Sequence, residues 1–131
     1  MLTFTIPGDP KPKKNSQQLI RAKGRTIPIQ SKNYRMFEAG CKDSIPKLDA
    51  PIGCPVNVKM VFFRDSKRRV DLVNLEQSIC DILTKYGVLA DDCRDIVASM
   101  DGSRVYHDKV NPRTVITITE LEERYEQWKT M

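Results

Sequence analysis

The chain has 131 residues, of which 40% are hydrophobic and 30% are charged, and its formal net charge at pH 7 is +5. This length and composition indicate one globular domain with a modest core. No run of about eighteen apolar residues is present to span a membrane, and the N-terminus lacks the basic segment and apolar core of a secretory signal.

The charge is distributed unevenly along the chain. Residues 1–69 contain fifteen Lys and Arg against five Asp and Glu, whereas residues 70–131 contain seven against twelve. A basic first half favours a polyanion such as nucleic acid as the partner. The alternative is that the charge of a small domain is unevenly distributed by chance, without any such partner.

The first third of the sequence predicts a strand, a hairpin and a helix. Leu2, Phe4 and Ile6 alternate with threonines, which is typical of a half-buried strand. A proline-rich basic segment follows at residues 7–16, and it is either an arm that contacts the DNA backbone or a solubilising loop. Gly24 lies in a turn with three cations, between two short apolar runs, which predicts a hairpin. A helix is expected from Ser31, its N-cap, to Ile45.

The middle of the chain predicts the longest strand and the best-defined helix. Residues 56–63 alternate and are strongly apolar, which indicates a central strand. A basic loop follows at residues 64–69. From Asp71 to Tyr86 an apolar stripe recurs at about 100° per residue, so a helix with one buried side is expected. Gly87 is expected to end it.

The last third predicts a strand at residues 96–98, a polar turn at 104–112, a strand at 115–119 and a terminal helix at 120–131. Together these elements predict a single α/β (α+β) domain over residues 1–131, with a mixed β-sheet and helices packed on one face. The terminal helix is an extension of that domain.

Cysteines and histidine give little functional signal. Cys41, Cys54, Cys80 and Cys93 form no C-x-x-C motif and are expected to stay reduced. Structural zinc is not expected, because the only histidine is His107 and zinc ligands usually occur in closer pairs.

Acidic residues flank the helix predicted at residues 71–86. Asp71 begins it, Asp91 and Asp92 follow it, and Asn74 and Asp81 lie along one of its sides. Carboxylate oxygens are the ligands that Mg²⁺ prefers, and such an ion assists phosphodiester cleavage. We therefore expect Asp71, Asp91 and Asp92 to bind Mg²⁺ and to be catalytic. The simpler alternatives are that Asp71 is only an N-cap and that Asp91-Asp92 is only a turn.

The order of these motifs resembles the RusA-type Holliday-junction resolvases. The resemblance rests on Asp71-x-x-Asn74-Leu75, Asp81-x-Leu83-x-Lys85-x-Gly87, Asp91-Asp92 with Ile96-Val97, Ile6-Pro7-Gly8, Lys13-Lys14-Asn15, Ser31 and Tyr34, and it extends to about residue 119. It implies a small α/β homodimer that binds four-way DNA junctions and nicks two symmetric strands with Mg²⁺. It also implies metal-binding and catalytic roles for Asp71 and Asp92, with Asp91 adjoining them.

Two positions depart from the family pattern. Val73 stands where a second aspartate is usual, and Gln77 stands where the family has a lysine. The first change removes a carboxylate from the ion, and the second removes a cation that would stabilise transition-state charge. Either Asp81 or Asp95 compensates, or the chain binds junctions and cuts poorly.

The sequence thus predicts an endonuclease for branched DNA, with no membrane association and no small-molecule substrate. The expected location is the cytoplasm, in a bacterial or phage-derived protein. The residues expected to bind nucleic acid are Lys13, Lys14, Asn15, Lys67, Arg68 and Arg69, and the lysines and arginines among them are expected to neutralise phosphates. Two other functions stay open: a DNA-binding relative with little or no cleavage, and an interaction module that acts through the acidic terminal helix.

Overall fold

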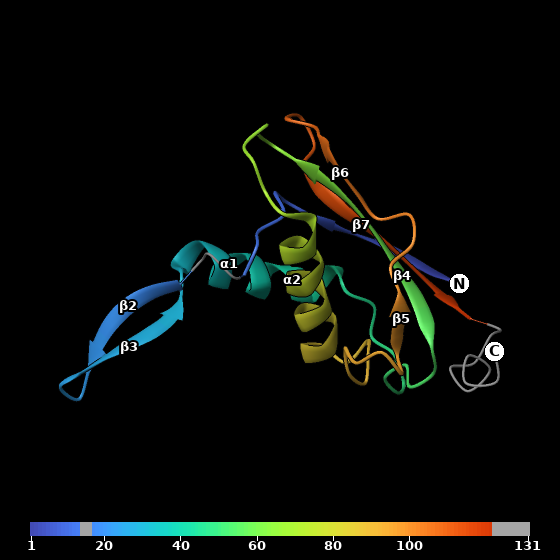
Figure 1. Ribbon diagram of the computed structural model, residues 1–131, viewed down its shortest axis with the longest axis horizontal. Helices are drawn as coiled ribbons and strands as arrows, with labels where there is room; N and C mark the ends of the chain where they lie inside the picture. The colour runs from blue at the N-terminus through green and yellow to red at the C-terminus, as the bar shows by residue number, and fades with distance from the viewer. Residues whose placement is uncertain (14–16, 122–131) are drawn as a thin grey trace.

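The structure, a computed structural model, describes residues 1–13 and 17–121; for residues 17–22 and 27–30 only the backbone is described. The elements are, in chain order, β1 (Leu2–Pro7), β2 (Gln17–Ala22), β3 (Arg25–Gln30), α1 (Lys32–Cys41), a 3₁₀ turn (Lys42–Ser44), β4 (Val56–Arg64), α2 (Leu72–Lys85), β5 (Val97–Ser99), β6 (Arg104–His107) and β7 (Arg113–Glu120). Figure 1 shows α1 and α2 on one side of the main sheet, with the β2–β3 hairpin extending away beyond α1. The predicted α+β class is confirmed.

The main sheet is mixed and has β4 at its centre. Its strand order is β1-β7-β4-β5, and β6 also pairs with β4. β7 lies antiparallel to both β1 and β4, whereas β5 and β6 lie parallel to β4. Because β4 and β6 run in the same direction, both finish at the end of the sheet where residues 65–71 lead into α2.

The core lies between this sheet and the two helices. Alternate side chains of β4 are completely buried: Val56, Val58, Met60 and Phe62. α2 contributes the stripe that the sequence predicted: Leu75, Ile79, Ile82 and Leu83. Burying one such side chain is worth roughly 1.5–3 kcal/mol. Packing therefore fixes which flank of α2 remains available to solvent.

Local signals set the helix ends. Ser31 caps α1, because its Oγ accepts a hydrogen bond from the Tyr34 backbone N–H at 3.2 Å. Gly87 follows α2 with φ +80°, a conformation that glycine adopts without steric cost. The Val88 N–H then donates to the Leu83 carbonyl at 2.9 Å, and the Gly87 N–H donates to the Thr84 carbonyl at 3.3 Å. These two bonds form a Schellman motif.

The predicted hairpin is also present. β2 and β3 pair antiparallel around a two-residue turn, and both Lys23 and Gly24 have positive φ. Two positive φ angles match the twist of a tight hairpin. The side chains of Lys23 and Arg25 are exposed near its tip.

Several element boundaries differ from the prediction. The polar segment expected to be a turn contains β6, whose four side chains are all exposed and so give no alternating pattern. Glu120, assigned to the terminal helix, is the last residue of β7 and pairs with Val56; residues 122–131 lie outside the described range. The first helix ends at Cys41, because Ile45 is extended before Pro46, as prolines require. No helix in the described ranges is long and apolar enough to cross a membrane.

Candidate active site

One flank of α2 carries the polar residues that concern function. Asp71, Asn74, Ser78, Asp81 and Lys85 follow one another at intervals of three or four residues, so they lie along one side of the helix. The apolar stripe packs on the sheet and holds this flank toward the N-terminal segment, α1 and the loop after Gly87. The flank thus borders three separate parts of the chain.

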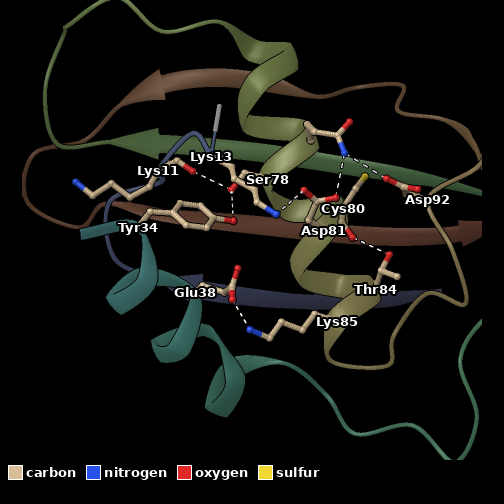
Figure 2. Close-up of polar contacts among 11 residues, drawn as sticks. Lys11, Lys13, Tyr34, Glu38, Ser78, Cys80, Asp81, Thr84, Lys85 and Asp92 are labelled. Atoms are coloured by element: carbon tan, nitrogen blue, oxygen red, sulfur yellow. Dashed lines mark hydrogen bonds and ion pairs between the residues drawn. The ribbon is translucent and has the colours of Figure 1, made fainter. Parts of the chain in front are cut away.

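Gln77 joins two carboxylates beside this flank. Its Nε2 donates to Asp81 Oδ1 at 3.0 Å and to Asp92 Oδ2 at 3.2 Å. Asp92 comes from the loop between α2 and β5, and Figure 2 shows its side chain pointing toward α2. The Asp91 side chain instead contacts its own loop, because its Oδ1 accepts the backbone N–H of Asp92 at 2.8 Å. Asp91 therefore orients the loop that presents Asp92.

The N-terminal segment is fixed against the same flank. Ser78, fully buried, donates its hydroxyl to the Lys11 carbonyl at 2.8 Å, and its Oγ lies 3.4 Å from the Tyr34 hydroxyl. Burial raises the pKa of Tyr34 to about 12, so this hydroxyl remains protonated. Two residues after Lys11, the Lys13 Nζ pairs with Asp81 Oδ2 at 3.4 Å (Figure 2).

These contacts border an open hollow of about 410 Å³ lined by Lys13, Glu38, Asp81, Thr84, Lys85 and Asp92. Within it Lys85 and Glu38 form an ion pair that links α2 to α1. That pair raises the pKa of Lys85. The hollow thus contains three carboxylates and two ammonium groups, a composition suited to cations and phosphates together.

A second hollow lies at the beginning of α2. It measures about 440 Å³ and is lined by Pro12, Arg64, Arg69, Val70, Asp71 and Asn74. The Asp71 side chain makes no capping hydrogen bond to α2, and its Oδ2 accepts from Asn74 Nδ2 at 3.3 Å. The alternative that Asp71 serves only as an N-cap is therefore not supported. Arg64 is held in place by a bond from its guanidinium to the Arg68 carbonyl at 2.8 Å.

The structure separates the acids that the sequence placed around one ion. Asp92 and Asp81 both accept from Gln77. Asp71 lies in the other hollow, roughly 9 Å along the helix axis from Gln77. Among the described residues, no three His, Cys, Asp or Glu side chains form a group that could hold a metal ion. The predicted three-acid cluster is therefore not assembled here. Of the two acids expected to compensate for Val73, Asp81 stands beside Asp92, while Asp95 is exposed.

The predicted DNA contacts divide in the same way. Lys13 lies in the first hollow and Arg69 in the second, and Lys67 and Arg68 are exposed between β4 and α2. Lys14 and Asn15 lie outside the described residues. Sequence reasoning included Lys11 only in the basic segment at residues 7–16 and Arg64 only in the basic loop at residues 64–69. It gave no signal that the Lys11 carbonyl accepts from Ser78, because these residues are distant in the sequence.

Carboxylates set beside cations on one helix flank, in a small α+β domain, are a combination that enzymes cleaving nucleic acid use. A comparison with protein-family models gives a match to endodeoxyribonuclease RusA over residues 7–119. The chain therefore belongs to the RusA endodeoxyribonuclease family, a family of nucleases that act on Holliday junctions, and the predicted resemblance is confirmed. No curated protein shows significant similarity to the chain.

Proposed function

We propose that this protein is a Mg²⁺-dependent endonuclease that resolves four-way DNA junctions by paired symmetric nicks in recombination and repair. The observation that supports this most directly is the pairing of Asp81 with Asp92 through Gln77. Family membership supports the substrate, which is branched DNA. The basic segments at residues 7–16 and 64–69 support the binding of DNA phosphates beside the site.

The donor set fits a hard divalent cation. Mg²⁺ keeps several waters and is commonly held by one or two carboxylates together with a substrate phosphate. Asp81 and Asp92 supply such a pair, and Asp91 holds the backbone that presents Asp92. When bound there, the ion would polarise the phosphate and lower the pKa of a coordinated water.

The remaining residues bind and orient the DNA. Lys13 and Arg69, with Lys67, Arg68 and Lys14, neutralise phosphates, and Asn15 also contacts the DNA. Each lysine or arginine contact adds about 0.9 to the log–log salt slope of binding. Asp71 and Asn74 act at the second hollow, where Asp71 is a further catalytic carboxylate. Two symmetric nicks require two copies of this site, so the active form is a homodimer with a two-fold axis matching that of the junction.

The test is a nicking assay on a synthetic four-way junction, with and without Mg²⁺. We expect cleavage by the wild type, and loss of cleavage with retained junction binding in Asp92→Asn and Asp71→Asn. Asp95→Asn is the matched control, since Asp95 is an exposed acid near Asp92. Titration calorimetry with Mn²⁺ on the DNA-free protein gives an independent readout, and Asp81→Asn and Asp92→Asn should each weaken Mn²⁺ binding. Undiminished cleavage by Asp92→Asn would refute the assignment.

A second candidate is a DNA-binding relative that cuts poorly. It is favoured by Gln77, whose neutral amide satisfies both carboxylates, and by Val73, which is 71% exposed and offers no ligand. This candidate predicts salt-sensitive junction binding by the wild type without nicking at any Mg²⁺ concentration.

A further inference from the structure

Three planar side chains stack across the open face of the sheet. Phe63 on β4 is paired in register with Tyr106 on β6 and with Arg113 on β7. The rings of Phe63 and Tyr106 are stacked, with centroids 5.5 Å apart and an interplanar angle of 23°. The Arg113 guanidinium carbon lies 3.8 Å from the Phe63 centroid. Because β6 and β7 flank β4 on opposite sides, Phe63 is sandwiched between Arg113 and Tyr106.

The stack is closed at one end and open at the other. At the β7 end, Arg113 is held by Asp108 at 3.0 Å. At the other end, β6 pairs with β4 alone among the described strands, and Figure 1 shows it at the margin of the sheet. Tyr106 is 48% exposed. Its side chain, at the open edge of the sheet, is therefore accessible to another planar group.

The surroundings favour DNA as the source of that group. Residues 104–113 carry three cationic side chains (Arg104, Lys109 and Arg113) and a single carboxylate, which is already paired with Arg113. The segment also adjoins the second hollow, because the Asp108 N–H donates to the Arg64 carbonyl at 2.8 Å and Arg64 lines that hollow beside Asp71. DNA that contacts Arg64 and Arg69 is thus brought to the end of the sheet where Tyr106 lies.

We propose that Tyr106 is a stacking platform for an unpaired base at the branch point of the DNA. This inference rests on the proposed action on branched DNA. Bases within a duplex have both faces covered by their neighbours, so only a base displaced at the junction offers a free face. Stacking on an aromatic ring tolerates any base and is a common contribution to binding of unpaired strands. A second copy of the chain is a poorer fit for this edge, because β6 is short and carries Arg104 and His107, and charged short edges resist strand pairing.

The test compares affinity for a four-way junction with affinity for a fully paired duplex of equal length, in EDTA so that no cleavage occurs. Tyr106→Ala should weaken junction binding by about five- to hundredfold and leave duplex binding unchanged. Tyr106→Phe and Tyr106→Trp should bind the junction as the wild type does. Val110→Ala, at an exposed position in the following turn, is the control. A junction labelled with 2-aminopurine beside the branch point should be quenched by the wild type and not by Tyr106→Ala.

Each other outcome overturns the inference. Equal losses on junction and duplex would mean a general phosphate-binding defect, and failure of Tyr106→Phe would mean a role for the hydroxyl. A change in oligomeric mass in Tyr106→Ala, measured by light scattering, would assign the edge to a second copy. If the wild type cleaves junctions while Tyr106→Ala binds them normally, the stacking inference alone fails. If the wild type binds no DNA, the proposed function fails with it.

Discussion

Replacing Gln77 with glutamate tests the carboxylate pair without removing either member. The two oxygens that accept from Gln77 lie 3.0 and 3.2 Å from one nitrogen, so the acids are neighbours held by a shared neutral donor. Gln77→Glu keeps the length of the side chain and replaces that donor with a third carboxylate. The variant thereby creates the three-acid group that the wild-type residues do not form.

The expected penalty follows from Coulomb's law. The new carboxylate would lie beside both acids, and like charges about 4 Å apart repel by roughly 1 kcal/mol in bulk water and by about 4 kcal/mol at an effective dielectric of 20. Gln77 is exposed, so the lower part of this range applies, and we expect the variant to lose about 1–2 kcal/mol of unfolding free energy in EDTA. Divalent cation at a hundredfold excess over its dissociation constant would restore about 2.7 kcal/mol.

The measurement is thermal and urea unfolding of both proteins, in EDTA and in saturating Mg²⁺ or Mn²⁺. Lys47→Gln is the control, because it makes the same change in net charge at an exposed loop position away from any helix end. The variant should be less stable than the wild type in EDTA and should gain more from the ion. Equal stability in EDTA, together with equal gains from the ion, would show that Asp81 and Asp92 do not share a site with residue 77.

Three further predictions concern the scaffold around the site. Ser78→Ala leaves the partly buried Lys11 carbonyl without its donor and should cost about 1–3 kcal/mol in urea unfolding, whereas Thr84→Ala on the same helix should change stability by less than about 0.5 kcal/mol; equal effects would refute the role of Ser78. Gly87→Ala should cost about 1–2 kcal/mol because of its positive φ, and an unchanged urea midpoint would contradict the Schellman ending. Asp108 accepts from the Asn111 N–H, from Arg113 and from the Val110 N–H, which lowers its pKa below 3.8. Its contribution is present above that value and is lost as pH falls through the lowered pKa, so Asp108→Asn should flatten the acid limb of a stability–pH curve, and an unchanged limb would refute the link.

Much of the fold could be predicted because it depends on local patterns. The apolar stripe of α2 repeats at the helical period and coincides with the buried side, so it predicts both the helix and its packing. Gly87 ends the helix through its local backbone conformation, which does not depend on where the helix packs. The alternation along β4 identified a central strand for the same reason. β6 could not be found in this way: all four of its residues are exposed, and it is a strand only because β4 offers an unpaired edge.

The site was predictable in composition and unpredictable in arrangement. The sequence identified the acids and cations. In the structure, however, Asp92 is paired with Asp81 through Gln77, a residue that the sequence analysis treated only as the replacement of a lysine. That link depends on how the loop after Gly87 folds back on α2. The docking of Lys11 on Ser78 joins residues 67 positions apart, and no local pattern reports such a contact.

The arrangement gives the two ends of the α2 flank different electrostatic character. At its beginning, the positive end of the helix dipole adds to Arg64 and Arg69, which favours a phosphate there despite Asp71. Further along, Asp81 and Asp92 carry two negative charges, against the one positive charge of Lys13, which pairs with Asp81. This local excess of negative charge favours a cation. A DNA strand along this flank would thus meet an anion site and a cation site about two helical turns apart, with the Lys11–Lys13 segment between them. Because these two sites do not coincide, tight junction binding does not by itself imply efficient cleavage, and the replacement of Lys by Gln77 acts at the cation site alone.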